Sequence, residues 1–167
     1  MTTFDLVEAK SEWSLDPEVH HLNHGSYGAL PRVVYAEQKR WQEEVHKNPV
    51  GFYARLSRPA VADARAKIAK FLGQEADQIA LVRNTTEAAT TTMRGFPFKS
   101  GDEVIVLDHE YGAITYAVKR GLLPAGGKVV EVVVPRLAAD EDVVKLVEAA
   151  ITGKTVMLVV DHVTSAT

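Results

Sequence analysis

The sequence contains no cysteine among its 167 residues. A chain without thiols can form no disulfide, no thiolate zinc site and no cysteine nucleophile. It also lacks an excess of basic residues, because its formal net charge is −3 at pH 7. That balance offers no positive field to the phosphate backbone of a nucleic acid, so we expect no nucleic-acid partner.

Long apolar runs are missing as well. No stretch approaches the roughly 20 consecutive apolar residues that a membrane-spanning helix needs. The first five residues lack the basic-then-apolar form of a signal peptide. We therefore expect a cytoplasmic protein without a membrane partner. Hydrophobic residues make up 46% and charged residues 25% of the chain, which is the usual mixture of a globular domain with one core.

From residue 79 onward, short runs of Val, Ile and Leu alternate with amphipathic segments of helical period. Strands are predicted at 79–82, 103–107, 129–134 and 155–160. Helices are predicted at 85–94, 112–122 and 140–151, the last one N-capped by Asp140. Near-continuous apolar strands joined by helices are typical of a buried parallel sheet with right-handed crossovers. The predicted fold class is α/β, with a mostly parallel sheet and flanking helices.

Two further helices are predicted in the first part of the chain, at 31–47 and 57–72. The first should end at Asn48, because the residue before a proline is pushed out of the helical conformation. Gly73 follows the second helix at the position that favours a left-handed residue. We expect residues 51–56 to form a loop, either a packed connector or a lip that reaches a pocket, in this subunit or another.

Three histidines, His20, His21 and His24, suggest a metal site at first sight. Their spacing fits no standard ligand pattern, and no acidic partner stands at helical spacing. Gly25 and Gly28 in the same stretch instead indicate a loop whose backbone approaches another group closely. We therefore expect no metal here.

The helix predicted at 85–94 begins with the form of a capping box, with Asn84 at the N-cap and Glu87 three residues later. This arrangement leaves the N–H groups of Thr85 and Thr86 free, with two hydroxyls beside them. Free N–H groups at the positive end of a helix dipole form a site for a phosphate dianion. Plain capping is the commoner reason for such a sequence, and both interpretations stay open at this point.

Polar residues gather after the predicted strands, in the segments 83–86, 108–111 and 161–165. Ligands of parallel sheets bind outside the carboxyl ends of the strands, where these segments would lie. Neither a Gly-x-Gly-x-x-Gly pattern nor a Walker lysine loop follows any strand, which disfavours a dinucleotide or a nucleoside triphosphate. The expected ligand carries one phosphate and a planar group on which Tyr111 or His109 can stack.

These segments resemble a known family. Asn84-Thr-Thr-Glu-Ala is similar to the phosphate-binding turn of class V, fold type I, pyridoxal-phosphate enzymes. Residues 108–113 resemble the segment that lays an aromatic ring over the pyridine, and residues 162–165 resemble the segment near the cofactor's phenolic oxygen. Residues 22–31 and 48–53 are most similar to the isopenicillin-N-epimerase-like branch, which is related to cysteine desulfurases and lyases.

The resemblance implies pyridoxal 5′-phosphate as the cofactor, although a fragment need not retain it. The residues implied to contact the cofactor are Asn84, Thr85, Thr86, Tyr111, His109 and Ser165. Either Tyr111 or His109 would stack on the ring, and Ser165 replaces the family's usual Asn. The residues implied to border the substrate are Asn23, His24, Tyr27 and Tyr53.

The family's chains are roughly twice as long as this one. The resemblance therefore implies an N-terminal arm, helix and substrate-side loop at 1–56, and the first half of the large cofactor domain at 57–167. It places the Schiff-base Lys, an Asp at the pyridine nitrogen and an Arg for the substrate carboxylate after Thr167, so no catalytic residue is expected in this chain. Lys99, Lys128 and Lys154 should lie at the opposite edge of the sheet.

The expected function is the N-terminal part of an enzyme that acts on an amino acid through Schiff-base chemistry. Epimerisation, transamination and cysteine desulfurisation or lysis are all open. The expected partners are a small amino-acid substrate and either a second copy in a homodimer or a polypeptide that supplies the C-terminal half. Two alternatives are a non-catalytic truncated product or pairing subunit, and a simple phosphate-binding module.

Overall fold

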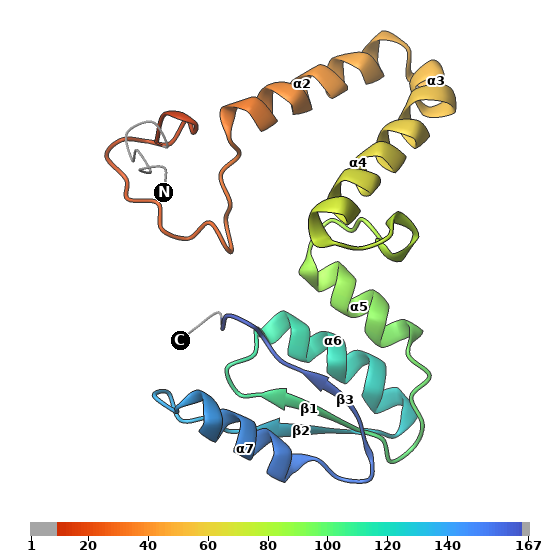
Figure 1. Ribbon diagram of the computed structural model, residues 1–167. Helices are drawn as coiled ribbons and strands as arrows, with labels where there is room; N and C mark the ends of the chain where they lie inside the picture. The colour runs from red at the N-terminus through yellow and green to blue at the C-terminus, as the bar shows by residue number, and fades with distance from the viewer. Residues whose placement is uncertain (1–9, 165–167) are drawn as a thin grey trace. The chain divides into compact units, whose positions relative to one another are not determined.

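The computed structural model describes residues 10–164. The chain divides into two compact units, Met1–Ala80 and Leu81–Thr167, whose elements are labelled in Figure 1. We describe each unit by itself, and the domain boundary expected between residues 56 and 57 stays a prediction. Within residues 10–164, none of the helices has the length and apolar character that crossing a bilayer requires.

The first unit is built from helices. Its elements are α2 (Arg32–Lys47), α3 (Pro49–Gly51), the π-helical turn η1 (Phe52–Leu56), α4 (Ser57–Leu72) and the 3₁₀ turn η2 (Ala76–Gln78). The two predicted long helices are thus confirmed. Gly73 ends α4 with φ = 66°, and the N–H of Gln74 donates to the carbonyl of Ala69 at 2.9 Å. A left-handed glycine at this position lets the chain satisfy the last carbonyls of the helix.

The loop predicted at 51–56 is wrong, because these residues are helical. Asn48 leaves the helical region with φ = −156°, as a residue before proline should. Its side-chain Oδ1 then accepts the N–H of Gly51 at 2.9 Å and so caps a new helix that starts at Pro49. The Asn48-Pro49 pair therefore ends one helix and begins the next, and η1 continues directly into α4.

The second unit holds a three-stranded parallel sheet in the order β2-β1-β3. Its strands are β1 (Glu103–Leu107), β2 (Lys128–Val132) and β3 (Thr155–Val159). Its helical elements are α5 (Thr85–Gly95), α6 (Gly112–Leu122), the 3₁₀ turn η3 (Leu123–Ala125) and α7 (Asp140–Ala150). The parallel α/β architecture is as predicted, with element ends within two residues of the predicted ones.

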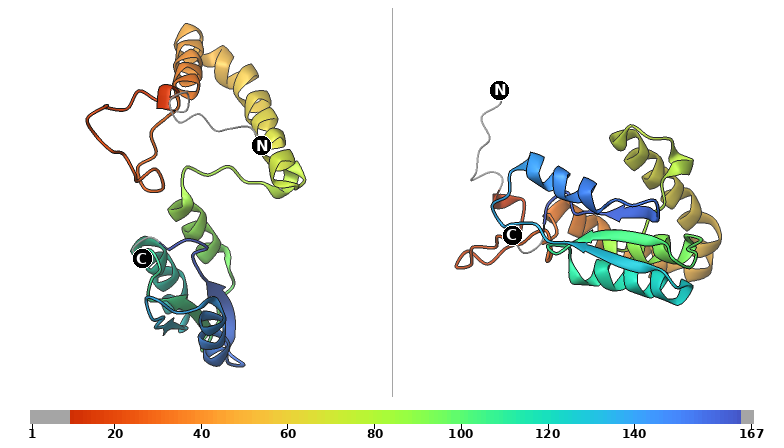
Figure 2. Two further views of the ribbon diagram at one scale, coloured as in Figure 1. Left: turned by 60° about the vertical axis from the view of Figure 1, so that its left-hand side comes forward. Right: turned by 90° about the horizontal axis from the view of Figure 1, so that it is seen from below.

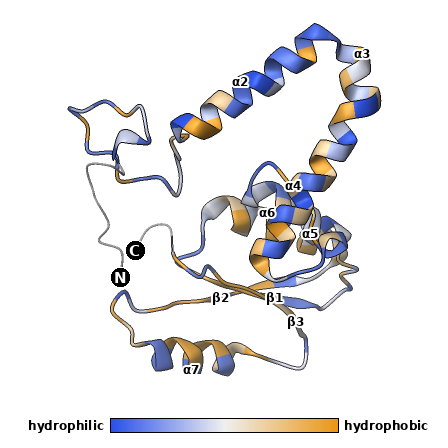
Figure 3. Cartoon of the chain, turned by 45° about the horizontal axis from the view of Figure 1, so that its top comes forward, coloured by the Kyte–Doolittle hydropathy of each residue, from blue (hydrophilic) through white to orange (hydrophobic). Residues whose placement is uncertain are grey.

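Successive residues of β1 point to opposite faces of the sheet. Val104 and Val106 pack against α6 in one buried cluster, which also includes Met93 of α5. Ile105 and Leu107 pack in a second cluster, against which residues of α7 lie. The right-hand view of Figure 2 shows α6 and α7 on opposite sides of the sheet, and Figure 3 shows the strands as hydrophobic. Because helices cover both faces of the sheet, side chains on both sides of each strand are mostly apolar, and the strands are continuous apolar runs in the sequence.

The strand predicted at 79–82 is wrong. These residues pair with no strand in the part of the chain that the structure describes, and Leu81 and Val82 are exposed. The apolar run Ile-Ala-Leu-Val suits a buried strand, but a strand also needs a neighbour that satisfies its backbone.

Two smaller predictions also need correction. The last helix is N-capped by Ala139 without a side-chain bond, and Asp140 is instead the first helical residue. Asp140, Glu141 and Asp142 form an acidic first turn, which is favourable at the positive end of the helix dipole. The strand predicted at 129–134 ends at Val132, because the N–H of Val134 donates to the Asp108 carboxylate at 3.0 Å.

Candidate functional site

The carboxyl edge of the sheet collects the polar segments of the second unit. The turn 108–111 follows β1 and leads into α6, and residues 161–164 follow β3. Helix α5 packs beside α6 near their C-terminal ends, because a Cβ on Gly121 would lie 2.8 Å from the carbonyl oxygen of Met93. Figure 1 shows α5 and α6 running in the same direction. Both helices therefore begin toward the carboxyl edge of the sheet, where parallel sheets bind their ligands.

The start of α5 is capped by Asn84, which is in extended conformation with φ = −166°. Its Oδ1 accepts the N–H of Glu87 at 2.9 Å, as predicted. In a capping box the Glu87 carboxylate would accept the backbone N–H of Asn84. Here it accepts the N–H of Arg83, one residue earlier, at 2.8 Å. Thr85 and Thr86 are exposed, and their N–H groups meet no acceptor within residues 10–164. The helix thus presents free donors to the solvent, which suits an oxyanion.

Glu87 links this helix start to Arg83. The Arg83 guanidinium, and then the Arg83 backbone N–H, hold the pKa of Glu87 below its usual range, and the nearest ion-pair atoms are 3.2 Å apart. Because the pKa is lowered in the folded state, the Glu87 carboxylate stabilises that state above its usual pKa. This contribution is lost as the pH falls through the lowered pKa.

The turn between β1 and α6 carries both candidate stacking residues. Asp108 accepts the N–H of Val134, and its Oδ1 lies 3.8 Å from Nε2 of His109. The His109 side chain is largely buried beside this carboxylate. Tyr111 is the N-cap residue of α6, and 52% of it is exposed. Tyr111 is therefore the more accessible of the two rings, and the choice between them stays a prediction.

Ser165, the remaining residue implied to contact a cofactor, lies outside the described residues. Two acidic residues of this edge received no role from the sequence, Glu110 and Asp161. Burial, and then Asp161, raise the pKa of Glu110 above its usual range. Both residues follow strands that a parallel sheet places side by side.

The residues implied to border a substrate lie in the first unit. Asn23 shapes a tight turn, because its side chain accepts the N–H of Ser26 at 3.2 Å and its carbonyl accepts that of Tyr27 at 3.0 Å. The ring of His24 packs edge-on against His21, with centroids 4.5 Å apart. Tyr53 lies in η1 and packs against Phe52. Their substrate contacts stay predictions.

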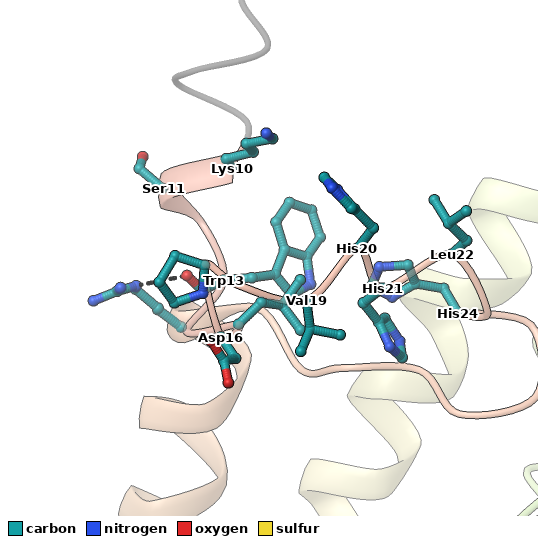
Figure 4. A pocket seen from close by; sticks show the side chains of 12 residues that line it. Lys10, Ser11, Trp13, Asp16, Val19, His20, His21, Leu22 and His24 are labelled. Carbon is teal, nitrogen blue, oxygen red and sulfur yellow. Dashed lines mark hydrogen bonds between the residues drawn. The ribbon is translucent and has the colours of Figure 1, made fainter.

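A hollow of about 740 Å³ lies in the arm that precedes α2 (Figure 4). Its walls come from residues 10–24 and Arg32, and Trp13 anchors them by donating its indole N–H to the carbonyl of Ala29 at 3.2 Å. Although three histidines line it, no group of three or more His, Asp or Glu side chains among residues 10–164 is placed to hold a metal. The hollow belongs to one open loop of the first unit.

The lysines nearest to the strands lie at the amino edge of the sheet. Lys99 and Lys154 precede β1 and β3, and Lys128 is the first residue of β2. This placement is as predicted. None of the lysines that the structure describes in the second unit follows a strand at its carboxyl end.

A parallel sheet with helices on both faces, and with an open helix start at its carboxyl edge, defines an α/β protein of the class that binds ligands at that edge. More particularly, the chain belongs to the aminotransferase class-V family, whose model matches residues 22–167.

Relatives of known name support this membership. The chain is 32% identical, over 95% of its length, to a probable chloroplastic L-cysteine desulfhydrase of Arabidopsis thaliana, of which it covers 37%. It is 29% identical, over 96% of its length, to isopenicillin N epimerase of Amycolatopsis lactamdurans, of which it covers 41%. The chain thus spans about two fifths of the length of these relatives.

A solved structure has the same fold. A mutant of C-DES, with glycine covalently linked to its PLP cofactor, superposes with a TM-score of 0.75 at 19% identity. The match covers 82% of this chain and 36% of that one. At this identity the likeness shows the fold alone.

Proposed function

We propose that this chain forms the phosphate-binding part of a pyridoxal-phosphate enzyme that acts on an amino acid. The observation that carries the proposal is the open start of α5, where two free N–H groups face solvent at the ligand-binding edge of a parallel sheet. Membership of the class-V family and the PLP cofactor of the C-DES structure support it.

The residues present fit the cofactor's phosphate. Thr85 and Thr86 offer two N–H donors and two hydroxyls, and Asn84 holds the turn that presents them. Tyr111 or His109 would provide the ring that stacks on the pyridine. When bound, the cofactor supplies an electron sink for bond breaking at the carbon atoms of an amino acid.

The residues that would complete the chemistry are proposed to come from a further stretch of polypeptide. The lysine for the Schiff base is the first of these, since Lys99, Lys128 and Lys154 lie at the amino edge of the sheet. The names of two relatives, a desulfhydrase and an epimerase, support desulfhydration and epimerisation as candidate reactions. We propose an amino-acid substrate, with epimerisation, transamination and cysteine desulfurisation or lysis all open.

Replacing Thr85 with proline should weaken binding of pyridoxal phosphate by about 10-fold or more. The change removes one N–H donor, and a hydrogen bond to a charged group contributes about 1.5–3 kcal/mol. The helix should persist, because proline is tolerated at the first helical position and Asn84 is already extended. Equilibrium dialysis or fluorescence titration measures the affinity.

Thr85→Ala is the matched control, because it removes the hydroxyl but keeps the N–H. It should weaken binding less than Thr85→Pro does. Pyridoxal without phosphate should bind more weakly than pyridoxal phosphate to the unaltered chain. Equal binding of pyridoxal phosphate by the two variants would contradict the phosphate assignment. Borohydride reduction followed by intact mass should reveal no specific lysine adduct, and a single adduct would show that this chain holds the Schiff-base residue.

A second candidate, a non-catalytic pairing subunit, is favoured by β3, which pairs only with β1 among residues 10–164. Leu158 lies beside Ile105 in the sheet register, yet 47% of it is exposed, and Val156 and Val160 are exposed on the same face. An apolar edge strand with unpaired backbone groups favours association with another chain. Gel filtration and a search for a co-purifying polypeptide separate this candidate from the first. A simple phosphate-binding module would bind inorganic phosphate as tightly as pyridoxal phosphate.

A further inference from the structure

A second hollow of the first unit lies along one face of α4. Its volume is about 280 Å³, and its walls come from Ser57, Arg58, Val61, Ala62 and Arg65. Positions three, four and seven residues apart share one face of a helix. Val61 and Ala62 have small side chains, and one arginine precedes them and another follows them on this face. The hollow is therefore an apolar gap between two guanidinium groups.

The Arg65 side chain contains a buried donor that lacks an acceptor. Its Nε atom is buried, and no atom among residues 10–164 accepts its hydrogen bond. Helical side chains lean toward the N-terminus of their helix, which is the direction from Arg65 to the other residues of the hollow. A charged N–H group that has lost water and gained no partner costs free energy. This position therefore fits an acceptor that residues 10–164 do not supply.

The positive charge of α4 is not balanced by its own side chains. The helix carries four Lys and Arg residues but a single acidic residue, Asp63. Asp63 pairs with Lys67 at 2.7 Å. Neither Arg58 nor Arg65 forms an ion pair within residues 10–164. Two cations without a counter-charge thus border the same hollow, which favours a ligand with two negative charges.

The other polar groups at this end of α4 are already engaged. The Ser57 hydroxyl donates to the carbonyl of Tyr53 at 3.2 Å, and the Ser57 N–H donates to the carbonyl of Phe52. Because η1 continues directly into α4, this is not an open helix start. An anion in the hollow would therefore be held by the two arginine side chains.

We propose that Arg58 and Arg65 bind a small dianion of the phosphate class in this hollow. A guanidinium group presents its N–H donors as a planar fork that matches a pair of phosphate oxygens, and the fork of Arg65 includes the unpartnered Nε. One water takes about 30 Å³ of liquid volume, so the hollow has room for a tetrahedral oxyanion. The site uses no residue of the α5 start and does not depend on the proposed function.

The test is an NMR titration of the arginine Nε–H signals of the full chain, in which sodium phosphate replaces sodium chloride at constant ionic strength. The Arg65 signal should move downfield and reach saturation, because its N–H gains an acceptor. Arg58→Gln and Arg65→Gln should each weaken the binding by about 5-fold or more. Arg65→Lys keeps the charge but loses the fork, so it should not restore the affinity.

Lys70→Gln is the matched control, because it removes one positive charge from the same helix at a position outside the hollow. It should weaken phosphate binding by less than about 2-fold. An equal loss in Lys70→Gln and Arg65→Gln would mean that phosphate responds only to the overall charge of α4, and the proposal would be wrong. Should Arg65→Gln fail to fold, the unaltered chain and Arg58→Gln, at an exposed position, decide the question.

The same titration separates this site from the one proposed at the start of α5. Thr85→Pro should leave the response of Arg65 unchanged. If the amides of Thr85 and Thr86 shift with phosphate while Arg65 does not, this proposal is overturned and the proposed function stands. If the Arg65 signal changes with chain concentration in the absence of phosphate, its acceptor is a carboxylate of a second copy, and the proposal is again overturned.

Discussion

Replacing Leu122 with alanine should lower the free energy of unfolding by about 2–5 kcal/mol. Leu122 is the last residue of α6, is 0% exposed and packs in the cluster formed by β1, α5 and α6. The truncation removes apolar contacts and leaves a cavity that backbone groups border. One of them is Gly127, where a Cβ would overlap the Leu122 side chain. Urea denaturation of the two chains measures the difference.

The neighbouring leucine provides the control. Leu123 begins η3 and is 52% exposed, so Leu123→Ala should change the stability by no more than about 0.5 kcal/mol. Both variants lose the same atoms from adjacent positions. Equal losses from the two would mean that Leu122 is not buried in this core.

Replacing Gly121 with alanine should destabilise the chain by about 1–3 kcal/mol, as overpacking of a tight contact does. A Cβ at this position would lie 2.8 Å from the carbonyl oxygen and 2.9 Å from the Cβ of Met93 in α5. Neither atom can move away without shifting a helix. Gly121 therefore sets the distance at which α5 and α6 pack, and with it the position of the helix start that is proposed to bind phosphate.

Gly112→Ala is a matched variant in the same helix. Gly112 is the first residue of α6, and a Cβ there would meet nothing within 4 Å. Alanine at an open helical position stabilises by up to about 1 kcal/mol, so the two substitutions should have opposite signs. Thermal unfolding of both variants tests this, and a destabilised Gly112→Ala would indicate that the first turn of α6 is more crowded than the structure shows.

The sequence predicts elements well where local pattern and tertiary packing agree. Val104 to Leu107 form an uninterrupted apolar run, and the sheet buries all four side chains. The run from Ile79 to Val82 has the same character but pairs with no described strand, because composition says nothing about the partner that a strand needs. At Asn48 a single residue ends α2 and caps α3. The prediction of a loop at 51–56 takes account of the first role only.

The candidate site was likewise predictable only where it depends on residues close in the sequence. The cap at Asn84 involves residues that are neighbours in the sequence, and the sequence predicts it correctly. The Glu87 side chain differs from the prediction, because its carboxylate accepts the N–H of Arg83 and not that of Asn84. The effect of Asp161 on the pKa of Glu110 joins residues that follow two different strands. It follows from the order of the strands in the sheet, which a single sequence does not state.

The central position of β1 has a consequence for how the second unit unfolds. This strand pairs with both of its neighbours and contributes alternate side chains to both apolar clusters. Neither cluster can open without removing support from the other through the same five residues. The backbone amides of β1 should therefore exchange with solvent only when the whole unit opens. Those of β3, which lies at the edge of the sheet that residues 10–164 form, should exchange sooner. A single strand thus makes the two layers one cooperative folding unit.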